Sequence, residues 1–366
     1  MKKNIKYILL IVLFIGFNLS HIQSFAQRSP ADSLLNFMNA NKPRASIYLI
    51  KNDDPLIALN ATKLMPLAQI TNILIAVEFA QEATNGAFDE NSYVPLSDIQ
   101  NYYVPVIDSV AQANWLQDEN DLQNIRNDSI SLIEVARGMV IYNVNANAEY
   151  LLDALGLDNV NANIKLFDIK HHTQIFPLPA SVFVFQNYHK YSQKAILRKI
   201  RNLSDRQYFK FIDANHEALK DDTSFKSSFK PKDFNVKMQQ LWSNKLPACT
   251  VGDYINICTA LNDRKNFTGI TYQILSEILE SYMENPDMQK LLKHAGMISG
   301  STPYLYNKLL YGTTLDRKKI EMAYFLNNLT PDESADIKRW ADDFDYKMLT
   351  NNRFRLKVVY LLSDSE

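Results

Sequence analysis

Glycine and paired metal ligands are scarce in this sequence. Only 9 of its 366 residues are glycine, against a usual share of about 7%. Neither G-x-x-x-x-G-K-[ST] nor G-x-G-x-x-G occurs, which excludes the glycine-cradled nucleotide sites. The 6 histidines and 2 cysteines form neither C-x-x-C nor H-E-x-x-H. We therefore expect no metal site and no cofactor.

The chain also lacks an excess of either charge. Its 39 Lys and Arg face 40 Asp and Glu, a formal net charge of −1, so composition gives no basis for nucleic-acid binding. Apolar residues make up 46% and charged residues 22%, which is typical of a globular protein. Segment 187–245 is locally basic, with 13 Lys and Arg against 6 Asp and Glu. A charged helical face in water is favoured there over contact with an anionic surface.

Residues 1–26 have the pattern of a secretory signal peptide. Lysines precede an apolar run over 7–19, and Ser24 and Ala26 supply the small residues before a cleavage site at Gln27. We expect the mature chain to be exported to the periplasm or the extracellular space, without further membrane attachment. An uncleaved anchor is the alternative, but the apolar run is shorter than the ~20 residues that a span needs.

Export would place Cys249 and Cys258 where a disulfide can persist. They flank a predicted helix start at Thr250–Asp253, which has the pattern of a capping box. A disulfide between them is one alternative. Two buried, inert thiols are the favoured one.

The N-terminal part of the chain predicts a helix, a hairpin and a second helix. Apolar residues recur on one side of 31–41, as in an amphipathic helix. Two β-prone runs within 44–60 are joined by a polar turn at 52–55. From Ile70 the apolar residues cover almost every side, which is typical of a buried helix, and Gly86 is placed to end it.

Helices are predicted in the middle of the chain and strands near its end. Residues 129–157 indicate two helices separated by a polar break at 143–147. Short β-prone runs follow at 294–301, 306–312 and 319–329. A helix near 334–349 follows an acidic first turn. The tail, 353–366, is either a further strand or the end of that helix.

Strands at both ends thus bracket a long helical region. This order predicts an α/β fold of the α+β type, with one antiparallel sheet built from N- and C-terminal strands, flanking terminal helices and an inserted all-helical lobe. We assign 27–366 to a single domain. Its sheet lobe would comprise 27–65 and 290–366, and its helical lobe 66–289.

Three segments carry a family resemblance. "MPLAQITNILIAVEFA", "MVIYNVNANAEYLLDALG" and "GMISGS" stand in the order of the nucleophile helix, the helical-lobe loop and the reactive-site strand of another family. The chain resembles the class A β-lactamase and penicillin-binding serine hydrolase superfamily over nearly all of its mature length. The resemblance implies a β-lactamase/transpeptidase-like fold.

The reactive positions of that superfamily hold other residue types. In its S-x-x-K motif the Ser attacks a carbonyl and the Lys helps to remove its proton. The register of the resemblance places Gln69 and Asn72 at these two positions. A carboxamide is neither a practical nucleophile nor a base near neutral pH.

The two other motifs are altered as well. S-D-N corresponds to 143–145, where Asn143 replaces the Ser and only Asn145 is kept. K-T-G corresponds to 298–300, where Ile298 replaces the Lys, and Ser299 and Gly300 keep the hydroxyl and the glycine. The sequence contains one S-x-x-K, at 227–230, in a polar stretch without a buried helix around it.

The connecting segment 168–185 contains no glutamate that could act in deacylation. Its adjacent histidines, His171 and His172, are expected to be hydrogen-bonded or solvated, because neighbouring side chains on an irregular segment seldom converge on one metal ion.

What the resemblance leaves intact is a binding cleft. It implies an oxyanion hole formed by the backbone N–H groups of Gln69 and Ser301, within a ligand pocket that also includes Asn145 and Ser299. The leading hypothesis is an exported pseudoenzyme that binds or scaffolds in the cell envelope, with a peptidoglycan peptide or a β-lactam-like molecule as ligand. The alternative is an active serine hydrolase of β-lactamase or D,D-peptidase type.

Overall fold

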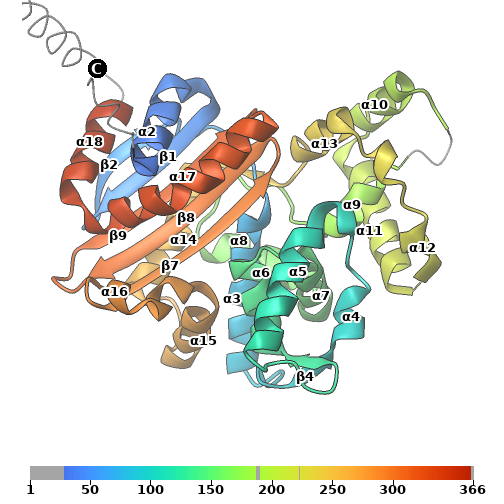
Figure 1. The fold of residues 1–366 in the computed structure, drawn as a ribbon, viewed down its shortest axis with the longest axis horizontal. Coiled ribbons are helices and arrows are strands. Elements are labelled where there is room, and N and C mark those ends of the chain that lie inside the picture. Colours follow the sequence, from blue (N-terminus) through green and yellow to red (C-terminus); the bar gives the residue numbers. More distant parts are fainter. Residues whose placement is uncertain (1–28, 187–189, 222, 364–366) are drawn as a thin grey trace, which may run out of the picture.

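A five-stranded antiparallel sheet forms one half of the molecule (Figure 1). The computed structural model describes residues 29–186, 190–221 and 223–363. The strand order is β2-β1-β9-β8-β7. The strands are β1 (Ala45–Lys51), β2 (Asp54–Leu59), β7 (Leu292–Thr302), β8 (Leu305–Thr314) and β9 (Lys319–Asn327). The predicted sheet built from both ends of the chain is therefore confirmed, because β1 pairs directly with β9.

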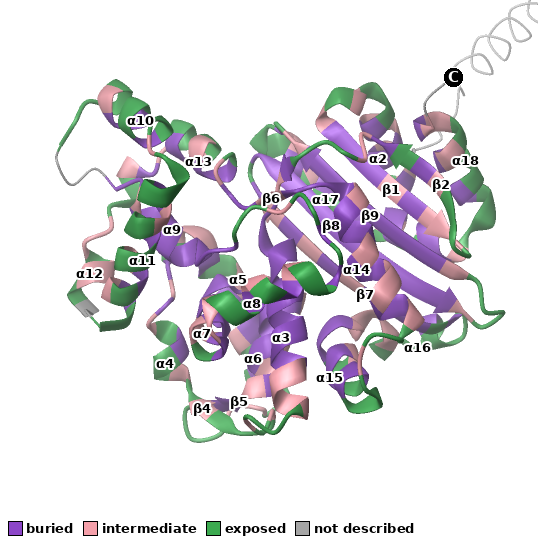
Figure 2. Cartoon of the chain, turned by 180° about the vertical axis from the view of Figure 1, so that it is seen from behind, coloured by how far each residue is buried: buried purple, intermediate pink, exposed green. Residues whose placement is uncertain are grey.

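Helices cover both faces of the sheet. On one face α2 (Pro30–Ala40), α17 (Pro331–Thr350) and α18 (Asn352–Leu362) pack together and bury an apolar core against the strands. On the other face α14 (Val251–Asp263) contacts β1, β8 and β9. Figure 2 shows the resulting buried strands between the two layers. The fold is thus of the predicted α+β type.

The inserted helices surround a single buried helix. This helix, α3 (Asn72–Thr84), buries nine consecutive residues from Asn72 to Ala80 and follows a 3-10 turn, η2 (Gln69–Thr71). Gly86, at φ +79°, follows its end as predicted. Around α3 lie α6 (Leu132–Ile141), α7 (Asn145–Leu155), α8 (Leu157–Leu166) and α15 (Gly269–Leu279). Their apolar side chains join those of α14 and the sheet in one continuous core.

A second group of helices has its own core beside the first (Figure 1). It consists of α9 (Leu178–Phe183), α10 (Gln193–Arg201), α11 (Asp205–Asp221), α12 (Thr223–Ser227) and α13 (Val236–Ser243). Most of the basic segment 187–245 lies in these helices. The remaining elements are η1 (Lys42–Arg44), β3 (Met65–Pro66), β4 (Tyr93–Pro95), α4 (Leu96–Gln100), α5 (Pro105–Asp121), β5 (Ser129–Ser131), η3 (Pro231–Asp233), β6 (Ala248–Cys249), η4 (Ser281–Glu284) and α16 (Pro286–Gln289). Because β4 pairs with β5, the inserted lobe is not entirely helical, as the sequence had predicted it to be.

Three local predictions need correction or completion. The hairpin turn is shorter than expected, because positive φ angles at Asn52 and Asp53 reverse the chain and β2 already begins at Asp54. The polar break predicted at 143–147 is shorter in the structure, since α7 begins at Asn145. The tail, whose structure the sequence left open, forms the separate helix α18.

Two further predictions are not decided by the fold. The proposed signal peptide lies outside the described residues. Within those residues, no helix has the length and apolar character needed to cross a membrane. The lobe bounds proposed from the sequence stay a prediction, although α14, from the span 66–289, packs directly on the sheet.

Candidate functional site

Three elements from distant parts of the sequence meet at the end of the buried helix. The turn η2 brings Gln69 beside the edge strand β7, which carries Ser301, and beside the first turn of α7, which begins at Asn145. The structure thus brings together three of the four residues predicted to line a pocket. The fourth, Ser299, lies two residues before Ser301 on β7.

The side chain of Gln69 bridges the other two elements. Its Oε1 accepts a hydrogen bond from the backbone N–H of Ser301 at 2.9 Å. Its Nε2 donates to Asn145 Oδ1 at 3.0 Å. Gln69 is 7% exposed and Asn145 is 2% exposed, so the bond between them is buried, whereas the bond from Ser301 is partly buried. The amide therefore links β7 to α7, with both of its polar atoms engaged.

The hydrogen-bond chain continues from Asn145 to Asp108 on α5. Asn145 Nδ2 donates to Asp108 Oδ1 at 3.2 Å. The backbone N–H groups of Asn145 and Ala146 donate to the same carboxylate, each at 2.8 Å. Asp108 thus caps the N-terminus of α7 from another helix. Burial raises the pKa of Asp108 to about 6, although the donated bonds oppose this shift.

Gly300 allows β7 to approach the turn closely. A Cβ atom at this position would lie 2.5 Å from the backbone nitrogen of Gln69 and 2.7 Å from that of Ile70. Both are backbone atoms and cannot move aside as a side chain could. The glycine is therefore required for the contact on which the bond between Ser301 and Gln69 depends.

Asn72 occupies the position expected for the lysine. It is 2% exposed, and its Nδ2 has no hydrogen-bond partner among the described residues. A neutral amide therefore replaces the base one helical turn after Gln69.

In the two other altered motifs, Asn143 is held by a hydrogen bond and Ile298 is packed in the core without a charge. Asn143 adopts a φ of 60°, and its Nδ2 donates to Ser299 Oγ at 3.4 Å. Ile298 is 1% exposed and belongs to the apolar core shared by the sheet and the helices. A buried aliphatic side chain therefore stands at the position that the register assigns to the lysine of the family motif.

Comparison with known proteins assigns the family. The family model described as "Beta-lactamase enzyme family" matches residues 29–270, which is more than half of the chain. The chain belongs to the beta-lactamase enzyme family. A search of curated proteins gave no match.

Solved β-lactamases share the fold at low sequence identity. A class A beta-lactamase from Bacteroides cellulosilyticus superposes with a TM-score of 0.50 at 14% identity, covering 89% of this chain and 100% of the other. A beta-lactamase from Sphaerobacter thermophilus gives 0.51 at 14% identity, covering 84% and 95%. One from Burkholderia vietnamiensis gives 0.51 at 11% identity, covering 90% and 99%. These matches establish the class A β-lactamase-like fold.

Within the β-lactamase register, the implied oxyanion hole is already in use. The resemblance assigns it to the N–H groups of Gln69 and Ser301, and the second of these donates to Gln69 Oε1. The side chain of Gln69 thus accepts from one of the two N–H groups that the resemblance assigns to substrate.

The sequence reasoning missed a buried ionic cluster on α7, the helix that begins at Asn145. Glu149, on α7 and fully buried, accepts from His216 Nδ1 at 2.7 Å and from the backbone N–H of Ala180 at 3.1 Å. His216 Nε2 lies 3.2 Å from Asp153 Oδ1, and Tyr102 stacks on the imidazole. Burial opposes the charge on His216, but the two carboxylates outweigh it and raise the pKa of His216 to about 9.

This cluster connects the two helical groups, because His216 lies on α11 and both carboxylates lie on α7. Glu149 has no distinguishing local signal, because the polar residues Asn145 and Asp153 lie one turn away on the same side of the helix. Its partner lies 67 positions away, so no local pattern could indicate the pair.

The cysteines and histidines that the sequence analysis singled out are either buried as free thiols or hydrogen-bonded to other residues. Cys249 and Cys258 are free and fully buried, so the disulfide is not formed, and burial raises the pKa of both thiols. His171 Nδ1 pairs with Asp253 at 2.9 Å, and His172 Nε2 pairs with the Tyr254 hydroxyl at 2.8 Å. The two histidines thus bind different partners, as expected for a hydrogen-bonded pair.

Proposed function

We propose that this protein is an exported, catalytically inactive member of the beta-lactamase enzyme family that acts by binding in the cell envelope. The observation that carries the proposal is the hydrogen bond from the Ser301 N–H to Gln69 Oε1. It places a side-chain oxygen where the acyl-transfer mechanism needs a substrate oxygen.

The chemistry of the neighbouring positions supports inactivity. Gln69 offers no nucleophile and Asn72 offers no base, and Ile298 removes the cation from the reactive strand. Loss of such a set of catalytic groups typically costs on the order of 10⁶ in turnover. In addition, a substrate carbonyl would have to displace Gln69 from Ser301 before it could be polarised.

The old cleft supports at most a weak interaction with an amide-containing ligand. Ser299 is half-buried and offers a hydroxyl, while the Gln69 side chain is already hydrogen-bonded to Asn145 and to the Ser301 N–H. A ligand carbonyl that takes the Ser301 N–H exchanges one hydrogen bond for another and gains little free energy. A peptidoglycan stem peptide is the ligand that the family relationship suggests, and we expect it to bind in the millimolar range.

The location is part of the same proposal. The support for it is the sequence pattern of residues 1–26, with cleavage before Gln27. Expression of the full chain should release a mature protein whose N-terminus is Gln27.

The proposal is tested by incubating the mature chain with nitrocefin and, separately, with a stem peptide ending in D-Ala-D-Ala. We expect no turnover above the rate in buffer, and chemical-shift changes confined to the cleft at millimolar peptide. Ser299→Ala and Ser301→Ala serve as matched variants. Hydrolysis that one of these two substitutions abolishes would overturn the assignment of inactivity.

A further inference from the structure

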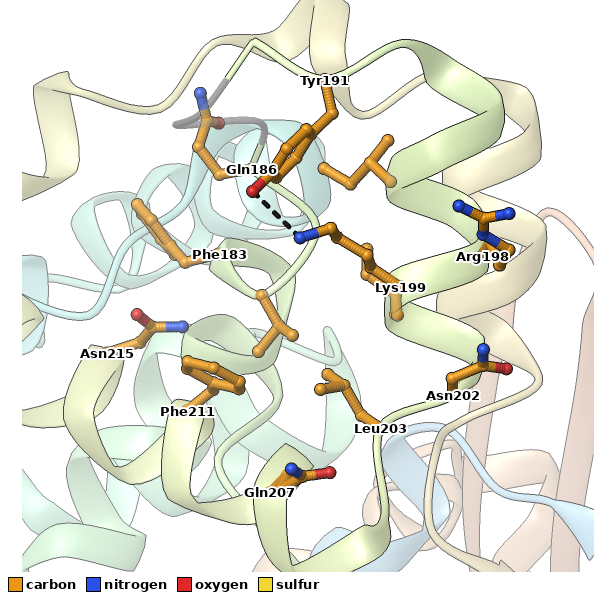
Figure 3. Close-up of a pocket in the computed structure, with 13 residues that line it drawn as sticks. Phe183, Gln186, Tyr191, Arg198, Lys199, Asn202, Leu203, Gln207, Phe211 and Asn215 are labelled. Atoms are coloured by element: carbon orange, nitrogen blue, oxygen red, sulfur yellow. Dashed lines mark hydrogen bonds between the residues drawn. The ribbon is translucent and has the colours of Figure 1, made fainter.

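A second candidate site lies in the helices of the basic segment, on elements other than those that carry Gln69. A cavity of about 520 Å³ opens between α9, α10 and α11 (Figure 3). Its volume falls within the ~300–1,000 Å³ typical of small-molecule pockets. The apolar side chains that line it are Phe183, Val184, Ile196, Ile200, Leu203 and Phe211.

The apolar wall of this cavity is held rigidly by the core behind it. Phe183 is 1% exposed and stacks on Phe225 with ring centroids 4.7 Å apart. Ile196 and Ile200 are buried on the inner face of α10. Phe211, by contrast, is 52% exposed at the opening. The lining thus includes one large apolar side chain that stays accessible from solvent.

One cation points into the cavity. Figure 3 shows the Lys199 amine directed toward Tyr191, and the Lys199 Nζ lies 2.9 Å from the Tyr191 hydroxyl and 4.1 Å from the ring centroid. In the described part of the chain, no carboxylate forms an ion pair with Lys199 or with Arg198, which also lines the cavity. The site therefore combines an apolar interior with a positive charge that the described carboxylates do not balance.

We propose that this cavity binds a small amphiphilic carboxylate, with its anionic head at Lys199 and its aliphatic chain between α10 and α11. Charge complementarity selects the head group, since the surrounding segment 187–245 carries 13 Lys and Arg against 6 Asp and Glu. The apolar lining selects the chain. This site goes beyond the proposed function, because it shares no residue with the old cleft.

Displacement of the anionic dye 1-anilinonaphthalene-8-sulfonate from the mature protein by decanoate tests the proposal. We expect decanoate to displace the dye saturably. Decyltrimethylammonium, which has the same chain and the opposite charge, should be at least about tenfold weaker.

Substitutions distinguish the binding of the anionic head group from the binding of the aliphatic chain. Lys199→Met keeps the length of the side chain but removes its charge, and we expect it to weaken decanoate binding about 10- to 100-fold, the range of a charge-assisted hydrogen bond. Lys194→Met, on the same helix but outside the cavity, is the matched control and should have no effect. Leu203→Trp should block the chain while leaving the charge in place. Circular dichroism of each variant establishes that it is folded.

Several outcomes would overturn the proposal. Equal affinity for the anionic and cationic amphiphiles, or equal losses in Lys199→Met and Lys194→Met, would show that Lys199 does not select the ligand. If decanoate does not bind saturably and the protein binds anionic vesicles instead, the proposal of a ligand cavity is wrong. The surface of α10 would then be the part that binds anions.

Discussion

The side-chain oxygen of Gln69 lies 2.9 Å from the backbone nitrogen of Ser301, although the two residues are 232 positions apart. This bond and the one from Gln69 Nε2 to Asn145 tie the sheet to the helices. The amide at the nucleophile position thus has a structural role that a serine side chain is too short to fill.

Removing this amide should destabilise the protein. Gln69→Ala leaves the Ser301 N–H and Asn145 Oδ1 without their partner, and we expect a loss of about 1–3 kcal/mol in the free energy of unfolding. Urea denaturation measures it. Gln273→Ala, at an exposed position on α15, should change the value by no more than about 0.5 kcal/mol. Equal effects of the two substitutions would mean that the bridge contributes nothing.

The close approach of β7 to η2 gives a second prediction. Gly300→Ala would place a Cβ atom 2.5 Å from the Gln69 nitrogen, so the strand must move away and the bond from Ser301 must break. We expect a loss of at least about 2 kcal/mol. In Gly269→Ala the new Cβ meets no atom within 4 Å, and the alanine should stabilise α15 by up to about 1 kcal/mol. We expect the midpoint temperature of thermal unfolding to fall in Gly300→Ala and to rise in Gly269→Ala. Changes of the same sign in both variants would contradict the prediction.

The burial of Ile298 predicts that the lysine of the family motif cannot be restored at this position without a loss of stability. Ile298→Lys would place an ammonium among the apolar side chains of the core shared by sheet and helices. We expect a loss of roughly 3–5 kcal/mol without any gain of nitrocefin hydrolysis. Ile298→Val is the matched control, at about 0.5–1.5 kcal/mol. A stable Lys variant would show that the side chain reaches solvent in the cleft.

The ionic cluster makes stability depend on pH. The pKa of His216 is raised to about 9 in the folded protein, against about 6.5 when unfolded. Its contribution is therefore complete below pH 6.5 and is lost as the pH rises through 9, by roughly 2–3 kcal/mol. Urea midpoints at pH 6 and pH 9.5 measure this loss.

The double variant His216→Gln/Glu149→Gln is the control for this prediction, because it removes the pair without leaving Glu149 charged and alone in the core. Its midpoint should change less between the two pH values than that of the native chain. Parallel changes would assign the pH dependence to other groups.

The elements of the fold could be predicted where the pattern is local. The β-prone runs at 294–301, 306–312 and 319–329 indicated β7, β8 and β9, and apolar residues on all sides indicated the burial of α3. The start of α7 was misplaced because its cap comes from Asp108, a residue on another helix.

For the candidate site, the sequence could predict which residues lie together but not the hydrogen bonds between them. Register against the family motifs indicated that Gln69, Asn145 and Ser301 would meet, but not that Gln69 would form hydrogen bonds to the other two. Side-chain hydrogen bonds across 76 and 232 residues leave no periodic signal in the sequence. The same reason applies to Glu149 and His216, and to the cavity beside Lys199, which forms only when three helices pack.

The most direct measurement is the intact mass of the mature protein after prolonged incubation with benzylpenicillin. If Gln69 closes the donor site at Ser301 and no nucleophile is present, the spectrum should contain only the unmodified mass. A stoichiometric increase by the mass of the penicillin, mapped to a single serine, would contradict the account and show a working acyl-enzyme site.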